Sequence, residues 1–69
     1  MKIGDLIEVN GGHQGIIISV ELMYPRHPES PPRNFEIMWS GDQPGYAFRK
    51  EEGLSTVSAM SVLKVVSRG

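Results

Sequence analysis

The sequence contains no cysteine, which excludes disulfides, thiolate zinc sites, iron–sulfur clusters and cysteine nucleophiles. It also has no excess of positive charge, because seven Lys and Arg stand against eight Asp and Glu, for a formal net charge of -1. Proteins that bind nucleic acid through its phosphates usually carry a basic balance or a basic stripe. The composition therefore gives no reason to expect nucleic-acid binding.

Long apolar runs are absent too. Apolar runs reach only three residues, as in residues 16–18, far short of the roughly 20 that span a bilayer. An acid at Asp5 comes too early for a secretory signal. We therefore expect no membrane contact and a cytoplasmic location, either in a host cell or in a virion assembled there.

The length of 69 residues predicts a single domain, residues 1–69, with a modest core. Eight Gly and five Pro cut the chain into pieces that are too short for most helices, which favours strands. Alternating apolar residues predict strands over residues 2–9, 16–22, 35–39, 46–49 and 62–66. Between the last two, Ser58 is a suitable N-cap for one helical turn over residues 58–61.

The clearest alternation lies in residues 16–22, where every second residue is apolar and β-branched residues are frequent. With residues 10–15 as a Gly-rich turn, this segment forms the second strand of a predicted hairpin. We expect one face of each strand to build the core. The predicted core consists of Ile7, Val9, Ile16, Ile18, Val20, Phe35, Ile37, Phe48, Leu63 and Val65, with Trp39 and Tyr46 closing one end.

Residues 24–34 hold four prolines, which cannot donate to a sheet ladder, so they predict a long loop within the domain. Loops of this length are unusual in compact folds unless they bind something or are loosely ordered. An extended proline segment loses little entropy on docking in a groove. The candidate contact residues of this loop are Tyr24, Pro25, Arg26, Pro31, Pro32 and Arg33.

Together these elements predict an all-β fold: a five-stranded, strongly bent, partly open barrel with a long Pro-rich loop and a short helical turn before the last strand.

The segment Gly4-Asp5-Leu6-Ile7-Glu8-Val9, followed by Gly12, Gly15, Ile17 and Val20, resembles the opening of Src-homology-3-like barrels and the KOW pattern in particular. As a whole the chain resembles small phage-encoded proteins of this design. The resemblance implies binding to protein or RNA, although the turn at residues 10–14 lacks the lysines typical of RNA-binding members.

No set of reactive side chains converges in the sequence. His13 and His27 are the only imidazoles and lie in two separate loops, which favours two solvated histidines over a metal site. Glu51 and Glu52 are adjacent and point to opposite faces of an extended segment, so they do not form an acid–base pair. We expect no catalytic residue, no metal and no cofactor. An aromatic cage built from Tyr24, Trp39, Tyr46 and Phe48 is a weaker alternative to simple packing.

If Ile16 and Ile18 face the core, then Leu6, Ile17 and Met38 face outward and can form an apolar patch. Contiguous apolar patches on small proteins mark contact surfaces. We therefore expect a non-enzymatic interaction or assembly module that self-associates or docks to a protein partner. The alternative is a KOW-like RNA- or DNA-binding protein, which would use Arg26, Arg33, Arg49 and Lys50.

Overall fold

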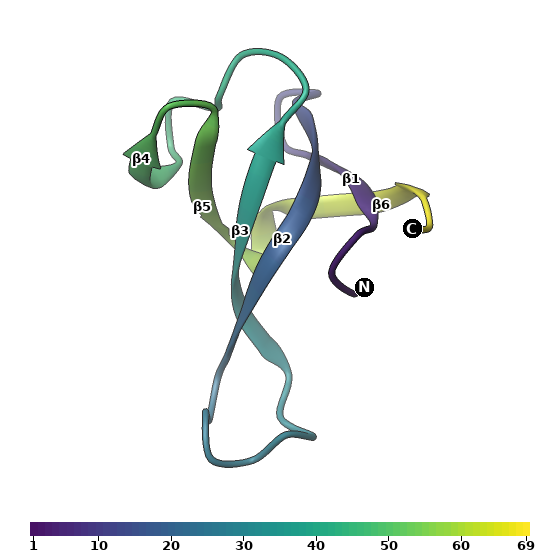
Figure 1. Cartoon of the computed structure of the whole chain (residues 1–69), viewed down its shortest axis with the longest axis vertical. Coiled ribbons are helices and arrows are strands. Elements are labelled where there is room, and N and C mark those ends of the chain that lie inside the picture. The colour runs from purple at the N-terminus through teal and green to yellow at the C-terminus, as the bar shows by residue number, and fades with distance from the viewer.

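The computed structural model describes residues 1–69, and its regular secondary structure is almost entirely β-strand (Figure 1). Its six strands and single turn of 3₁₀ helix are β1 (Leu6–Val9), β2 (Gln14–Leu22), β3 (Pro32–Trp39), β4 (Phe48–Glu51), β5 (Leu54–Ser58), η1 (Ala59–Ser61) and β6 (Val62–Ser67). The all-β class and the helical turn before the last strand are confirmed. Ser58 caps that turn as expected, because its side chain accepts from the Met60 amide.

The strands form one antiparallel sheet in the order β4-β5-β3-β2-β1-β6. The expected count of five was wrong because the segment after residue 49 does not stay irregular. It turns back at Glu52 and Gly53, where Gly53 takes the left-handed φ of 74° that favours glycine, and forms the hairpin β4–β5. In Figure 1, β4 lies at one side of the sheet and β1 and β6 at the other, where the two chain ends come close together.

The core centres on Ile7, Val9, Ile17, Phe35 and Ile37, which have no exposed surface. These residues, except Ile17, agree with the predicted core. Trp39 also belongs to the core, and its indole nitrogen donates to Ser55 Oγ over 2.6 Å. This bond satisfies two buried polar groups and explains how a serine fits among apolar neighbours.

The predicted orientation of residues 16–18 was wrong: Ile17 is fully buried, whereas Ile16 and Ile18 are partly exposed. Ile7 stands opposite Gly15, so the inward face of β2 carries Gly15 and then Ile17. A bulge between Ile17 and Ser19 then shifts the alternation by one residue, so that Val20 packs against the core as predicted. In the sequence this bulge is hidden by three consecutive isoleucines.

Three other predicted core residues lie largely outside the core. Phe48 is 40% exposed because β4 is an edge strand with a neighbour on one side only, and Tyr46, in the turn before that strand, is 48% exposed. Leu63 is 57% exposed, while Val65 packs partly against the core as expected. Two residues that were not predicted to lie in the core, Ala47 and Val57, are buried there.

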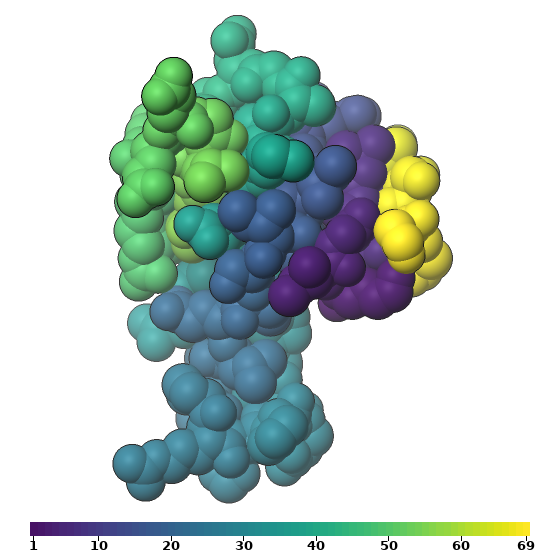
Figure 2. Space-filling model, in the orientation of Figure 1, coloured from purple at the N-terminus to yellow at the C-terminus, as the bar shows by residue number.

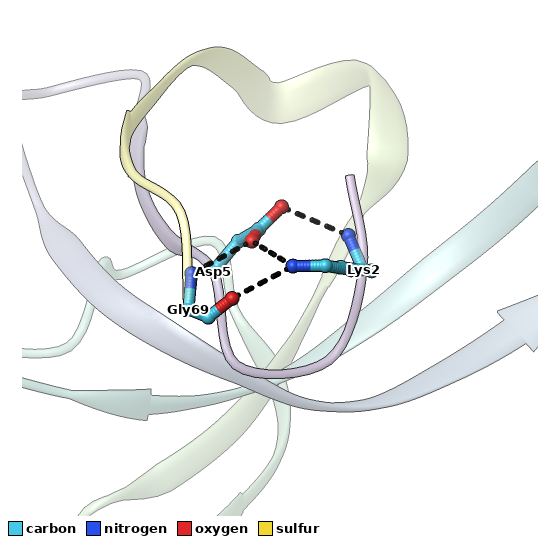
Figure 3. Close-up of polar contacts among 3 residues, drawn as sticks. All are labelled: Lys2, Asp5 and Gly69. Atoms are coloured by element: carbon cyan, nitrogen blue, oxygen red, sulfur yellow. Dashed lines mark hydrogen bonds and ion pairs between the residues drawn. The ribbon is translucent and has the colours of Figure 1, made fainter.

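The two ends of the chain are joined through Asp5, whose side chain is completely buried (Figure 3). Asp5 Oδ2 accepts from the Lys2 amide over 3.0 Å, and Oδ1 accepts from the Gly69 amide over 3.1 Å. Lys2 Nζ lies 3.4 Å from the same Oδ1 and donates to the Gly69 carbonyl oxygen over 2.8 Å. We call this set of contacts the terminal latch.

We expect Ile17→Ala to lower the free energy of unfolding by about 2–5 kcal/mol, the usual cost of truncating a buried isoleucine. The neighbouring substitution Ile16→Ala should cost only about 1 kcal/mol, because that side chain keeps part of its surface in water. Urea unfolding followed by circular dichroism measures both. An Ile16→Ala cost equal to or above that of Ile17→Ala would contradict the orientation of β2.

The terminal latch should make stability depend on acid pH. The Gly69 amide first, and then the Lys2 amide and ammonium, hold the pKa of Asp5 below its ordinary value of 3.8. The contribution of ionised Asp5 to the free energy of unfolding is therefore present above pH 3.8. It is lost as the pH falls through the lowered pKa of Asp5 in the folded state. Asp5→Asn should be less stable at neutral pH, because in either orientation its side-chain NH₂ would face at least one donor, the Lys2 amide or the Gly69 amide with Lys2 Nζ. Its melting temperature should also fall less steeply with acid; an unchanged slope would contradict the latch.

Candidate interaction site

An uncharged apolar row crosses four neighbouring strands on the face of the sheet that points away from the core. Leu6 stands opposite Ile16, Ile16 opposite Met38, and Met38 opposite Leu54. Opposed residues of antiparallel strands lie about 5 Å apart and share a face, so these four side chains are contiguous. We call them the outer row.

The outer row corrects the predicted patch. Leu6 and Met38 face outward as expected, but Ile17 lies in the core and Ile16 takes its place. Met38 is 47% exposed and the other three members are partly exposed. Leu54 was missed because the segment that holds it was not expected to form a strand.

The second candidate surface is an arm made by the far ends of β2 and β3 and the loop between them, residues 23–31. It projects from the body of the protein, as the blue and teal atoms at the bottom of Figure 2 show. No other strand flanks this loop, and all its residues except Ser30 are exposed. Pro32 and Arg33 belong to β3 instead of the loop, with Pro32 as the first residue of the strand, where a missing amide donor is tolerated.

Backbone and side-chain hydrogen bonds close the loop into a compact shape. The Met23 amide donates to the Pro31 carbonyl oxygen, and the His27 and Ser30 amides donate to the carbonyl oxygens of Tyr24 and His27, each over 2.9 Å. Ser30 Oγ accepts from the Tyr24 amide and donates to the Tyr24 carbonyl oxygen. The loop is thus a pair of closed turns, not an extended proline segment.

The loop presents an aromatic ring at its tip. Tyr24 is 61% exposed, and its ring meets that of His27 edge-on with the ring centres 6.4 Å apart. Tyr24, Pro25, Arg26 and His27 together line an open hollow. Of the predicted contact residues, the structure thus gathers Tyr24, Pro25 and Arg26 at the tip and leaves Pro31, Pro32 and Arg33 on the returning segment.

Two of the four basic residues of the nucleic-acid alternative, Arg49 and Lys50, make contacts within the protein. Arg49 lies 3.5 Å from Glu21 Oε2, and Lys50 donates to the Gly45 carbonyl oxygen. Asn34 Nδ2 donates to Glu21 Oε1 over 2.5 Å and holds the pKa of Glu21 below its ordinary value, with smaller effects from Arg49 and Arg33. Of the four cations, Arg49 is therefore already paired with a carboxylate of the protein itself, and Arg26 lies in the loop of the arm.

Arg49 reaches Glu21 from a left-handed backbone, with a φ of 53° that non-glycine residues seldom adopt. It sits in a bulge of β4 between Phe48 and Glu51, and its guanidinium lies 5.3 Å from the centre of the Phe48 ring. The bulge therefore turns Arg49 across the sheet toward the base of the arm.

The two histidines lie apart from each other, and each packs edge-on against one aromatic ring, His13 against Trp39 and His27 against Tyr24. His13 Nδ1 is 2.9 Å from the Asp42 carbonyl oxygen at the end of the sheet opposite the arm, whereas His27 is on the arm, 3.9 Å from Glu29 Oε1. No three His, Asp or Glu side chains are placed to hold a metal ion. The aromatic-cage alternative is wrong: Trp39 is buried, the Tyr46 hydroxyl donates to the Asn10 carbonyl oxygen, and Tyr24 is at the loop tip.

Neither a family model, nor a curated protein, nor a solved structure matches this chain. No helix of the structure has the length and apolar character needed to cross a bilayer.

We expect Ser30→Ala to open the arm without unfolding the body, because Ser30 Oγ makes both side-chain hydrogen bonds that close the loop. Trypsin should then cleave the Ser30→Ala variant after Arg26 several-fold faster than it cleaves the wild type. The melting temperature of the variant should be almost unchanged. Ser40→Ala is the matched control, since it removes one hydrogen bond, to the Gln14 carbonyl oxygen, at the other end of the sheet. Equal cleavage of all three proteins would show that Ser30 does not hold the loop.

Proposed function

We propose that this protein is a non-enzymatic assembly module whose copies associate through the outer row. The observation that carries the proposal is the unbroken line of apolar side chains over four strands, with no charged residue among its members. An interior of only eight buried apolar residues stands beside ten large apolar side chains that are at least 40% exposed. Removing part of this exposed apolar surface from water would favour association.

A second copy suits the outer row for a geometric reason. A two-fold axis that runs along the row places the same apolar residues of two copies against each other, which is the isologous contact of most homodimers. Because the row is uncharged, the contact between the two rows themselves brings no like charges together. A standard interface covers about 800 Å² per partner, compared with a total surface of 4490 Å², so the contact would extend beyond the row to neighbouring residues such as Ile18.

The same proposal includes the finer fold class. We infer that the open sheet is a partly closed Src-homology-3-like barrel, supported by its strand order, in which β1 lies between β2 and β6. The sharp change of direction between β2 and β1 in Figure 1 also supports it. A phage origin and a place in a host cytoplasm or virion stay predictions from the resemblance.

Sedimentation velocity over micromolar to millimolar concentrations tests the proposed function. We expect the wild-type protein to dimerise and both Ile16→Lys and Met38→Lys to be monomeric at every concentration, because a lysine in the row brings two charges into the contact. Met60→Lys is the control, since Met60 is 92% exposed and lies outside the row. A monomeric wild type, or a dimer that survives both substitutions, would rule the proposal out.

The nucleic-acid alternative makes a different prediction. Labelled RNA or DNA should then bind at low salt, and the affinity should fall steeply as salt is added. An apolar contact between copies should be almost indifferent to salt. Absence of binding at low salt would remove the alternative.

A further inference from the structure

The last part of the chain follows a period of three residues instead of the period of two expected of a strand. Ala59, Val62 and Val65 pack against the core. The residues that follow each of them, Met60, Leu63 and Val66, are 92%, 57% and 43% exposed. The third set is polar and consists of Ser61, Lys64 and Ser67.

Two bulges produce this period. On β1, Leu6, Ile7, Glu8 and Val9 stand opposite Ser67, Val65, Lys64 and Val62, so that Leu63 and Val66 have no partner strand residue. Bulges redirect the side chain of the extra residue. Here each of them turns an aliphatic side chain toward water. With Met60 from the 3₁₀ turn, they form what we call the β6 ridge: Met60, Leu63 and Val66.

The bulges also limit what can bind to this edge. β6 is an outer strand of the sheet, and outer strands normally attract further strands. A ladder needs regular spacing of amides and carbonyls, which two bulges within six residues interrupt. A partner must therefore contact side chains, not continue the sheet.

The spacing of the ridge fits a helix. Leu63 and Val66 both lie in β6, and three residues of extended chain span about 10 Å, which is close to the two turns of an α-helix at about 10.8 Å. An amphipathic helix laid along β6 would thus meet Leu63 and Val66 two turns apart, with Met60 beyond them at the 3₁₀ turn. Helices bind proteins in this way through an apolar stripe at regular spacing.

The charges beside the ridge select the partner. Residues 53–69 contain Lys64 and Arg68 but no Asp or Glu, and neither cation makes an ion pair. Lys64 stands opposite Glu8, but Glu8 Oε1 instead accepts from Gln14 Nε2 over 3.0 Å. Two copies joined ridge to ridge would bring four cations together with no new carboxylate. The ridge therefore favours a different, acidic partner.

We propose that the β6 ridge is a docking site for an acidic amphipathic helix of another protein, in addition to the contact between copies through the outer row. The apolar stripe of the partner helix would pack against Met60, Leu63 and Val66. Lys64 and Arg68 would pair with carboxylates that flank the stripe. The two surfaces share no residue, so substitutions distinguish them.

A displayed library of random peptides of about 20 residues, long enough to form helices, tests this proposal. Peptides that bind the wild-type protein are selected first. Those that also bind the triple variant Met60→Ser/Leu63→Ser/Val66→Ser are then removed, so that the remaining peptides depend on the ridge. We expect the remaining peptides to be rich in Asp and Glu beside apolar residues at helical spacing. Their affinity should fall at least about tenfold for Leu63→Ser alone, since a central apolar anchor carries much of the binding energy.

Two further variants make the outcome decisive. Lys64→Glu/Arg68→Glu should lose the acidic peptides, whereas Met38→Lys in the outer row should bind them as the wild type does. The proposal is overturned if no selected peptide depends on the ridge. It is equally overturned if the ridge-dependent peptides are basic or have the alternating pattern of a strand. Melting curves confirm that each variant is folded.

Discussion

The close approach of β2 and β3 at Gly15 determines the orientation of the first half of β2, up to the bulge that follows Ile17. A Cβ at this position would run into the Ile37 side chain and lie 2.7 Å from the Met38 carbonyl oxygen. Only glycine can therefore occupy the inward position opposite Trp39. Once Gly15 faces inward, Ile17 must face inward as well, and Ile16 must face outward.

The core and the outer row are two results of this one constraint. Ile17 completes the interior with Ile7 and Ile37, while Ile16 joins the outward side chains of Leu6 and Met38 into a continuous line. A shift of one residue would expose the fully buried Ile17 and break the row at its centre. The packing that stabilises the fold thus also builds the surface that we propose for association.

Much of the architecture could be predicted from the sequence, and the errors share one cause. Alternation located β1, β2, β3 and β6, and Ser58 located the helical turn, because these signals are local. Bulges are not local: the one after Ile17 depends on how β3 pairs, and those at Leu63 and Val66 depend on β1. Gly15 was interpreted as part of a turn, since nothing near it in the sequence indicates the side chain of Ile37. The strand β5 was missed because Ser55 and Thr56 look exposed until the Trp39 indole and β4 cover them.

The bulges also explain why this protein would associate through faces and not through edges. The outer strand β4 is only four residues long and is bent at Arg49, and β6 is bent twice. An open sheet with regular edges would add strands without limit, which natural sheets avoid. Here each edge irregularity places a side chain where it can be used: Arg49 crosses toward Glu21 at the base of the arm, and Leu63 and Val66 extend into solvent. The same local change that stops uncontrolled pairing therefore creates a surface that a specific partner can recognise.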